Sequence, residues 1–223
     1  MQSANELVYT PDEISNGIYS LPEVYGGAIS NVYSNYIKRA LDIVFSALLF
    51  AVLSPLMLLT IIVIKIDSAG SAIFKQERVG LKGKAFVIYK FRSMRIDAEM
   101  GGPVWASKSD SRTTRIGRFI RKYRVDELPQ LVNIMRGDMS FVGPRPEREY
   151  FYEKFTQRIP DFRSRLAVKP GLTGWAQVNG GYDIGPAQKL KYDKEYISGF
   201  SFRMDLRIVL RTFGVVLRGA GAR

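Results

Sequence analysis

The sequence predicts a mainly α-helical fold with a small β-hairpin (class α+β) and one broken hydrophobic helix in a membrane. Three observations carry this prediction. Residues 43–64 form an uncharged apolar run that a Ser-Pro pair interrupts. Two short segments rich in β-branched and aromatic residues flank a Gly-Leu-Lys-Gly turn, which is typical of a hairpin. Further segments place apolar residues at helical spacing, two of them among clustered arginines, which indicates helices with a basic amphipathic character.

The apolar run at residues 43–64 is long enough to span a membrane. As a straight helix it would extend about 33 Å, against a hydrocarbon core of roughly 30 Å. Pro55 lies near its middle and has no N–H for the carbonyl of Ala51, so we expect a bend there. The Ser54 hydroxyl is expected to donate to the Phe50 carbonyl and ease the bend. Each half, about 15–18 Å long, would reach the middle of the bilayer and return.

The charges around this run are compatible with two topologies. Lys38 and Arg39 precede it and Lys65 follows it, and basic residues at both ends favour a re-entrant helix whose ends share the cytoplasmic face. The first 37 residues carry acidic but no basic side chains, so that tail could instead be exported and leave a kinked spanning helix. A buried helix of a soluble core fits less well, because the run has no polar stripe.

Composition divides the chain into three parts. Residues 1–35 are polar, acidic and turn-rich, and are predicted to be a mobile or loosely docked tail. Residues 36–66 hold the membrane helix, and residues 67–223 suffice for one catalytic domain. No cleavable signal peptide is expected, because the apolar run begins too late and is too long.

The third part is predicted to contain strands, helices and two loops. The two basic helices among them fit either a solvated face over a small core or a position in the plane of the lipid headgroups. In chain order we expect strands at 72–74 and 85–91 joined by a turn at 80–83, a loop at 100–112, a basic amphipathic helix at 112–124, a helix at 130–136, a glycine-rich loop at 170–181 and a basic amphipathic helix around 203–213.

The composition restricts the partners and the chemistry. A net charge of +12 indicates an anionic partner, such as nucleic acid, anionic lipid or a phosphorylated substrate. Beside an apolar anchor, anionic membrane lipids are the simplest of these. Cysteine and histidine are absent, which excludes disulfides, thiolate nucleophiles, histidine-based catalysis and Cys or His metal ligands. An enzyme of this composition relies on carboxylates, Lys, Arg, Tyr, hydroxyls or an oxygen-bound metal.

The adjacent carboxylates Asp126 and Glu127 are the leading candidates for chemistry. In a structural role they would cap the helix that starts near Pro129 and complement its dipole. In a catalytic role, the basic residues that precede them would keep both ionised. Asp126 would then be a nucleophile toward phosphorus, and Glu127 a ligand for Mg²⁺, which prefers oxygen donors. The five preceding basic residues are Arg115, Arg118, Arg121, Lys122 and Arg124.

Two arginine motifs are candidates for binding a diphosphate. Lys90-Phe91-Arg92-Ser93-Met94 ends a predicted strand, and Gly143-Pro144-Arg145-Pro146 makes a stiff loop. Arginine suits bidentate phosphate binding, and a proline-fixed backbone lowers the entropy lost in presenting it. The chain has neither of the glycine-rich motifs of phosphate loops and dinucleotide-binding folds, so nucleotide binding would use another arrangement.

Seven motifs follow one another along the chain, and their combination is specific although each alone is weak. They are Lys38-Arg39-Ala-Leu-Asp42, Ser54-Pro55, Gln76-Glu-Arg78-Val-Gly80, Lys90-Phe-Arg92-Ser-Met94, Asp126-Glu-Leu-Pro-Gln130, Gly143-Pro-Arg145-Pro146 and Lys169-Pro-Gly-Leu-Thr-Gly-Trp175. In this order they make the chain resemble the monotopic phosphoglycosyl transferases, bacterial sugar transferases also described as polyprenyl-phosphate hexose-1-phosphate transferases. The resemblance runs from about residue 36 to the C-terminus. It is closest to the short, core-only form, without the four-helix membrane domain of larger members.

The resemblance implies a reaction in two displacements. Members of the family move a sugar-1-phosphate from a UDP-sugar to undecaprenyl phosphate, giving UMP and undecaprenyl-diphosphate-sugar. This step initiates assembly of capsule, exopolysaccharide, O-antigen or glycoprotein glycans. By similarity, Asp126 would form a covalent phosphosugar, Glu127 with Asp126 would hold Mg²⁺, and the lipid phosphate would then displace Asp126 in a ping-pong mechanism.

The resemblance also implies where the other residues act. Ser54 and Pro55 would make the helix re-entrant, with the catalytic domain on the cytoplasmic face of the bacterial inner membrane. A homodimer is compatible with the family. The expected nucleotide-sugar contacts are Arg145, Pro144, Arg92, Lys90 and Arg118, and the expected contacts with polyprenyl phosphate or membrane are Lys38, Arg39, Ser54, Pro55 and Arg78.

Two functions other than that of a transferase are compatible with parts of the sequence. A catalytically silent membrane scaffold of a polysaccharide assembly complex would use the same anchor and basic helices. A membrane-tethered nucleic-acid binder would use the positive charge, but the aromatic residues are dispersed and no RNA-binding or helix-turn-helix signature is present. We therefore expect no nucleic-acid partner.

Overall fold

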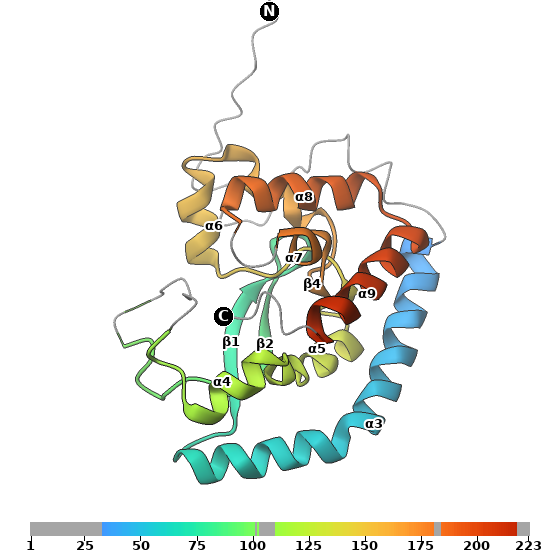
Figure 1. The fold of residues 1–223 in the computed structure, drawn as a ribbon. Coiled ribbons are helices and arrows are strands. Elements are labelled where there is room, and N and C mark those ends of the chain that lie inside the picture. Colours follow the sequence, from blue (N-terminus) through green and yellow to red (C-terminus); the bar gives the residue numbers. More distant parts are fainter. Residues whose placement is uncertain (1–32, 101, 103–109, 181–183, 218–223) are drawn as a thin grey trace, which may run out of the picture.

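The computed structural model describes residues 33–100, 102, 110–180 and 184–217. It confirms a mainly helical fold with a small β-hairpin, and Figure 1 shows a long bent helix, α3, wrapped around a domain in which helices surround that hairpin. Residues 1–32 of the predicted tail and most of the predicted loop at 100–112 lie outside the described residues.

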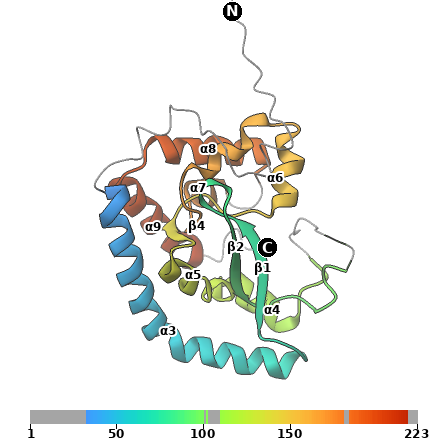
Figure 2. The same cartoon turned by 180° about the vertical axis from the view of Figure 1, so that it is seen from behind.

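Helix α3 (Lys38–Asp67) follows a π turn at Tyr33–Ile37 and contains the apolar run. Both ribbon views show one sharp bend near its middle, so that its two halves follow two sides of the domain (Figures 1 and 2). The Ser54 hydroxyl donates to the carbonyl of Ala51 at 2.8 Å, and not to that of Phe50 as the sequence suggested. Ala51 is the residue whose carbonyl Pro55 leaves without a backbone donor, so this bond compensates for the proline.

The burial of α3 is the reverse of that in a soluble core helix. Its buried side chains include Lys38, Asp42, Ser46 and Thr60, whereas most of its leucines, isoleucines and valines are exposed. Only 17% of its most apolar 18-residue window is buried, and the helix is long and apolar enough to cross a membrane by length and composition. Exposed apolar surface of this extent indicates contact with lipid or another apolar partner.

The hairpin pairs β1 (Ile73–Val79) with β2 (Ala85–Phe91) in antiparallel register, from Ile73 opposite Phe91 to Val79 opposite Ala85. A 3₁₀ turn at Leu81–Gly83 joins the strands, as the glycine-flanked turn predicted. The first strand is longer than the predicted 72–74, because its polar residues pair with β2 as regularly as its apolar ones.

Helix α4 (Arg115–Lys122) is shorter than the predicted 112–124. The Thr114 hydroxyl caps its first turn by accepting from the Gly117 amide at 2.9 Å. Beyond its last turn, Arg124 adopts a positive φ of 55°, which no helix continues. Helix α5 (Gln130–Arg136) has the predicted bounds and ends at Gly137, whose φ of 93° favours glycine.

The prediction of a loop over residues 170–181 is wrong for its described part. Strand β4 (Gly171–Thr173) pairs in parallel with β3 (Ser140–Val142), and α7 (Trp175–Gly180) follows it. Glycine permits this pairing, because a Cβ at Gly171 would lie 2.1 Å from the amide nitrogen of Gly143. The remaining segments are α6 (Glu149–Thr156), a 3₁₀ segment (Pro160–Ala167), α8 (Pro186–Ser198) and α9 (Phe202–Leu217), the last being the predicted basic helix.

Apolar clusters join the hairpin to the helices around it. Ile88 of β2 packs with Leu131 and Ile134 of α5, and Phe91 at the end of β2 packs in a cluster with Ile120 of α4 and Ile64 of α3. Both helices therefore pack against one strand, and the short turn between them lies beside the end of β2. This turn carries Asp126 and Glu127.

Candidate active site

A cavity of about 840 Å³ lies beside the hairpin and is lined by many more basic than acidic side chains. The hairpin, the turn between α4 and α5, the segment after β3 and helix α8 all contribute to its lining. Its acidic lining residues are Asp126, Glu127, Glu147 and Glu99. Its basic lining residues include Arg78, Lys90, Arg92, Arg121, Arg124, Arg145, Arg148 and Lys189. Such a surface is suited to an anion with several charges.

Asp126 and Glu127 occupy a single 3₁₀ turn, Val125–Glu127, which Arg124 introduces in the left-handed conformation. Both carboxylates are buried, with 8% and 6% of the residue surface exposed. Helix α5 begins after Pro129 without a side-chain cap, so the capping role considered from the sequence is not observed. Left-handed backbone at a non-glycine residue costs free energy, and such positions concentrate at functional sites.

Glu127 is the centre of an ion-pair cluster. Its Oε1 accepts from Nη2 of Arg145 at 2.5 Å and from Nζ of Lys90 at 3.4 Å. Burial by itself would raise the pKa of Glu127, but Arg145, Lys90 and further cations together hold that pKa well below its usual range. Glu127 is therefore an ionised carboxylate at neutral pH in the lining of the cavity.

Asp126 differs from its neighbour in pKa. Burial, and then the negative charge of Glu127, raise the pKa of Asp126 to about 6, against the opposing effect of Lys90 and Arg121. The cations therefore do not bring the pKa of Asp126 below its usual range, because burial outweighs them. Of those five residues, only Arg121 and Arg124 line the cavity. A carboxylate with this pKa is mostly ionised at neutral pH and more basic than an exposed aspartate.

Three of the predicted phosphate-binding residues line the cavity together with Arg145. Lys90 lies next to Glu127, and burial lowers its pKa although Glu127 opposes the shift. Arg78 donates from Nη1 to the carbonyl of Pro146 at 3.2 Å. Arg92 donates to the carbonyls of Ser68 and Ala69, directly after α3, which ties that segment to the end of β2.

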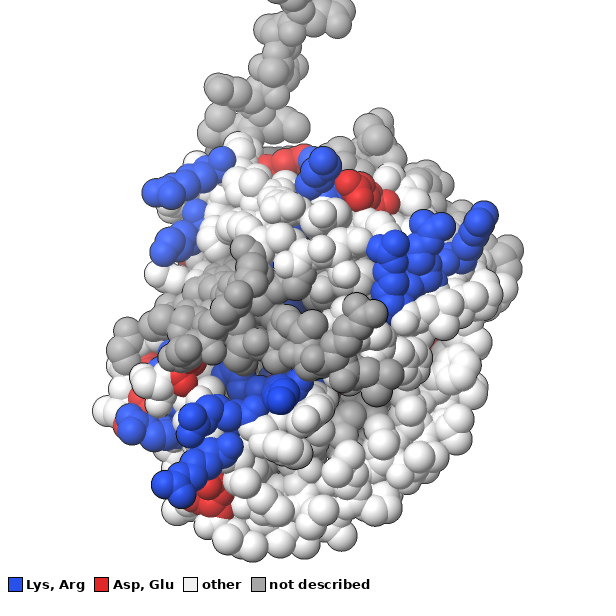
Figure 3. All heavy atoms as spheres, in the orientation of Figure 1, with Lys and Arg blue, Asp and Glu red and all other residues white. Residues whose placement is uncertain are grey.

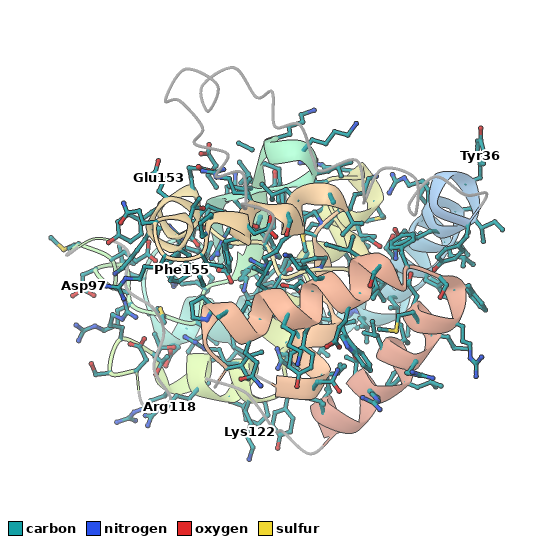
Figure 4. All side chains as sticks on the ribbon, turned by 90° about the horizontal axis from the view of Figure 1, so that it is seen from above. Tyr36, Asp97, Arg118, Lys122, Glu153 and Phe155 are labelled. Atoms are coloured by element: carbon teal, nitrogen blue, oxygen red, sulfur yellow. The ribbon has the colours of Figure 1, made fainter. Side chains whose placement is uncertain are left out.

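The structure places Pro144 and Arg118 outside the cavity lining. Pro144 is buried, and its carbonyl accepts from the amide of Gly171 at 3.0 Å. Arg118 is exposed on α4, and Figure 4 shows its side chain at the periphery, as it does that of Lys122. A role of either residue in binding a nucleotide sugar stays a prediction.

The predicted lipid-phosphate contacts Lys38 and Arg39 both have partners within the protein. Lys38 is buried, and its Nζ lies 2.5 Å from Oδ2 of Asp205 in α9. Arg39 donates to the carbonyls of Ile134 and Met135, in the last turn of α5. Neither lines the cavity, and their contact with a lipid phosphate stays a prediction, as does a specific role for Ser54 and Pro55 in the membrane.

Sequence reasoning missed Glu147 and Lys189. Nζ of Lys189 in α8 donates to Oε1 of Glu147 at 3.0 Å, and Arg78 approaches the other oxygen of that carboxylate at 3.7 Å. Glu147 directly follows the Gly-Pro-Arg-Pro motif, which was the one available signal. Lys189 had none, because its partner is 42 positions away in the chain.

The two adjacent carboxylates fit a magnesium ion better than a metal held by protein ligands alone. Among the described residues, no group of three or more His, Cys, Asp or Glu side chains is arranged to hold a metal ion. Mg²⁺ usually keeps several waters and takes one or two carboxylates together with substrate phosphates. The donors here, Asp126 and Glu127 beside a cationic cavity, match that requirement.

The fold and the site combine a basic cavity with buried carboxylates and an exposed apolar helix, features that suit a membrane-associated protein with a site for a phosphorylated ligand. Residues 33–219 match the family described as bacterial sugar transferase, and the chain belongs to this family. This confirms the resemblance seen in the motifs.

Relatives with named activities include three similar proteins. One is the UDP-N-acetylgalactosamine-undecaprenyl-phosphate N-acetylgalactosaminephosphotransferase of Aeromonas hydrophila, 45% identical over 197 residues, which cover 87% of this chain and 46% of the relative. Two UDP-glucose:undecaprenyl-phosphate glucose-1-phosphate transferases are similar. That of Caulobacter vibrioides is 43% identical over 84% of this chain and 72% of its own length. That of Escherichia coli is 37% identical over 92% of this chain and 45% of its own length. The chain thus spans about half the length of two of these three relatives.

Proposed function

We propose that this protein transfers a sugar-1-phosphate from a UDP-sugar to undecaprenyl phosphate, releasing UMP and forming undecaprenyl-diphosphate-sugar. The observation that carries the proposal is the pair of neighbouring buried carboxylates with different pKa values in one cation-lined cavity. Glu127 is held ionised by Arg145 and Lys90, whereas the pKa of Asp126 is raised to about 6 in the same cation-lined cavity. The names of the relatives support the substrates.

In the first displacement, Asp126 acts as the nucleophile. One of its carboxylate oxygens forms a bond to the phosphorus that bears the sugar, and the bond from that phosphorus to the bridging oxygen of the diphosphate breaks. UMP leaves with the electron pair, and the sugar phosphate remains on Asp126. A carboxylate of raised pKa suits this step, because a more basic oxygen donates its electrons more readily.

The cationic side chains around Asp126 stabilise the charge that moves onto the leaving group. Arg145 and Arg78 present planar guanidinium groups suited to phosphate oxygens, and Lys90 adds a point charge beside them. When Mg²⁺ is bound, with Glu127 and Asp126 as ligands, it would neutralise the diphosphate. Phosphoryl transfer depends mainly on positioning and charge stabilisation, so the lack of histidine is no obstacle.

In the second displacement, a phosphate oxygen of undecaprenyl phosphate attacks the same phosphorus. The bond to Asp126 breaks and the carboxylate is restored, so no net proton transfer is needed. The lipid acceptor requires the cavity to lie close to a membrane surface.

The arrangement of α3 supports a re-entrant topology with both ends on one side. At its start, Lys38 pairs with Asp205 of α9, and directly after its end, Ser68 and Ala69 bond to Arg92 of the hairpin. A straight spanning helix of 30 residues would separate these attachments by about 45 Å across the bilayer. Both attachments belong to one domain, which supports our proposal that the domain lies on one side of the bacterial inner membrane, at its cytoplasmic face.

Exposed apolar side chains on other helices support a shallow contact with lipid. In α9, Phe202, Leu206, Leu210 and Phe213 are exposed beside the arginines of that helix, and in α4 Phe119 is 60% exposed. Figure 3 shows basic side chains in separate patches and a largely uncharged surface along α3. Helices of this kind lie in the headgroup plane, where arginines meet anionic lipids.

The function is tested by incubating detergent-solubilised protein with Mg²⁺, undecaprenyl phosphate and a panel of UDP-sugars. We expect release of UMP from at least one donor, dependent on undecaprenyl phosphate for turnover, and loss of release in Asp126→Ala. Exposed Asp161, which pairs with Lys194 and does not line the cavity, provides the control variant Asp161→Ala. Full activity of Asp126→Ala would exclude Asp126 as the nucleophile, and no turnover with any donor would favour the scaffold.

The topology is tested with single cysteines, since the chain contains none. Ser3→Cys in the tail and Lys191→Cys on α8 would be treated with a membrane-impermeant maleimide in intact spheroplasts. We expect both to react only after permeabilisation. Reaction of Cys at position 3 alone in intact cells would show that α3 spans the membrane.

A further inference from the structure

We propose that Arg165 and Asp193 are positioning residues: a buried ion pair that fixes the backbone of Arg145 and thereby aims its guanidinium into the cavity. The proposal rests on the proposed function, in which Arg145 binds the diphosphate of the donor. Neither residue lines the cavity, so neither touches substrate.

The segment that presents Arg145 is held by its own carbonyl groups. Four consecutive carbonyls, those of residues 144–147, each accept a hydrogen bond, and the donors belong to three parts of the domain: β1, the 3₁₀ segment at Pro160–Ala167 and β4. The donors are the amide of Gly171 to Pro144 at 3.0 Å, Nη2 of Arg165 to Arg145 at 2.9 Å, Nη1 of Arg78 to Pro146 at 3.2 Å and the amide of Val79 to Glu147 at 3.0 Å. The bond from Arg165 is the one that acts on Arg145 itself.

Asp193 fixes the orientation of Arg165. Its Oδ2 accepts from Nε of Arg165 at 2.5 Å, and the two side chains are 1% and 0% exposed. The guanidinium also lies over the ring of Phe162, 4.9 Å from its centroid. Nε of Arg165 thus binds Asp193 while Nη2 binds the Arg145 carbonyl. Only arginine offers donors in this planar arrangement.

Stability alone is a poor explanation for this pair. Burying two charges costs desolvation free energy that their attraction often only balances, and a well-packed apolar pair of similar volume is frequently as stable. What the ion pair adds is a directed hydrogen bond to one carbonyl, at the residue whose side chain binds Glu127 on the other side. Geometry at Arg145 is therefore the property that the pair controls.

Helix α8 acts on the same segment at a second point. Lys189 lies four residues before Asp193, so both side chains project from one face of α8. Lys189 binds the Glu147 carboxylate directly, while Asp193 reaches the segment through Arg165. Together these contacts make α8 the rigid support behind the Gly-Pro-Arg-Pro motif.

Arg165→Lys tests the proposal most cleanly, because it keeps the charge that balances Asp193 but cannot bridge both partners. Asp193→Asn is the second variant, should the first fold poorly. We expect each to lower kcat/KM for the UDP-sugar by about tenfold, mainly through a higher KM, since small displacements of a positioning group have effects of this size or larger. Arg163→Lys, in the same 3₁₀ segment but paired with Glu149, is the matched control and should retain kcat/KM.

A double-mutant cycle separates positioning from general support of the fold. In an Arg145→Ala background, Arg165→Lys should cause no further loss of kcat/KM, because the group that it positions is already gone. An equal loss in both backgrounds would overturn the proposal.

The same four proteins would be titrated calorimetrically with UDP, and the affinities should show the same non-additivity. If the wild type turns over no UDP-sugar, the proposed function fails, yet the UDP cycle still decides the positioning claim. Additive losses of UDP affinity, or no UDP binding by the wild type, would overturn it.

Discussion

Nη2 of Arg145 lies 2.5 Å from Oε1 of Glu127, so a guanidinium proposed to bind the donor is already engaged with the carboxylate proposed to hold the metal. This contact helps keep Glu127 ionised and holds the Arg145 guanidinium in the lining of the cavity. When substrate and metal bind, contacts with the diphosphate and Mg²⁺ would replace the contact between Arg145 and Glu127. The charged groups are already in place, which lowers the free energy needed to organise the site on binding.

Replacing Arg145 with lysine should reduce kcat/KM for the UDP-sugar by about a hundredfold, the usual scale for one electrostatic donor in an active site. Lysine keeps the charge but loses the fork that can contact Glu127 and phosphate at once. Steady-state UMP release would measure the loss. Arg158→Lys, on an exposed residue outside the cavity lining, is the control. Near-wild-type kcat/KM for Arg145→Lys would show that only the charge matters.

The rate of the first displacement should rise with pH through about 6, where Asp126 loses its proton. The ionised form is the nucleophile, so a raised pKa means activity present above that pH and lost as the pH falls through it. Single-turnover formation of the phosphosugar adduct at varied pH would measure this rise, the acidic limb of the pH–rate profile.

Removing a neighbouring cation should shift the midpoint of this acidic limb to higher pH. Arg121 lowers the pKa of Asp126, so Arg121→Gln should shift the midpoint to higher pH. Arg115→Gln, on an exposed residue of the same helix, should leave the midpoint unchanged. A downward shift in Arg121→Gln would contradict the assignment of the limb to Asp126.

Gly117→Ala should destabilise the protein by about 1–3 kcal/mol, the usual cost of overpacking. A Cβ there would lie 1.9 Å from the carbonyl oxygen of Ser93, so α4 would have to move away from the Lys90–Met94 motif. Thermal unfolding in detergent would measure the loss. Gly214→Ala in α9, where a Cβ meets nothing within 4 Å, should be neutral or slightly stabilising. Equal melting temperatures for both variants would argue against this tight contact.

Lys38→Met should destabilise the protein by about 3 kcal/mol, because it leaves the buried Asp205 carboxylate without its cation. Adding Asp205→Asn should recover part of the loss, since the uncompensated charge is then removed. The free energies of unfolding of the single and double variants would test this coupling. Additive losses would show that Lys38 and Asp205 do not act as a pair.

Much of the fold follows from local patterns in the sequence. Strand 85–91 and helix 130–136 have the predicted bounds because their apolar residues repeat with the period of the element that forms. The parallel pair β3–β4 could not be predicted, since it joins residues 140–142 to 171–173 through a close approach of glycine backbones that leaves no periodic signal. The basic helices were recognised from their arginines, but α8 was missed because its buried positions include Lys189 and Asp193.

In the candidate site, too, the residues that local sequence motifs reveal depend on partners from distant segments of the chain. Asp126 and Glu127 were found because they are adjacent in the chain, and Arg145 because prolines flank it. The partners that set their properties come from distant segments, as Arg165 and Lys189 illustrate. The raised pKa of Asp126 could not be read from the charges along the chain, because its main cause is burial, which depends on the tertiary fold.

Intact-mass measurement of the protein after incubation with UDP-sugar and Mg²⁺, without undecaprenyl phosphate, tests the central claim most directly. We predict a mass increase of one sugar phosphate on the wild type, its absence in Asp126→Asn, and its disappearance when undecaprenyl phosphate is added. An adduct that persists in Asp126→Asn, or UMP release by a wild type that never carries an adduct, would contradict a covalent intermediate on Asp126.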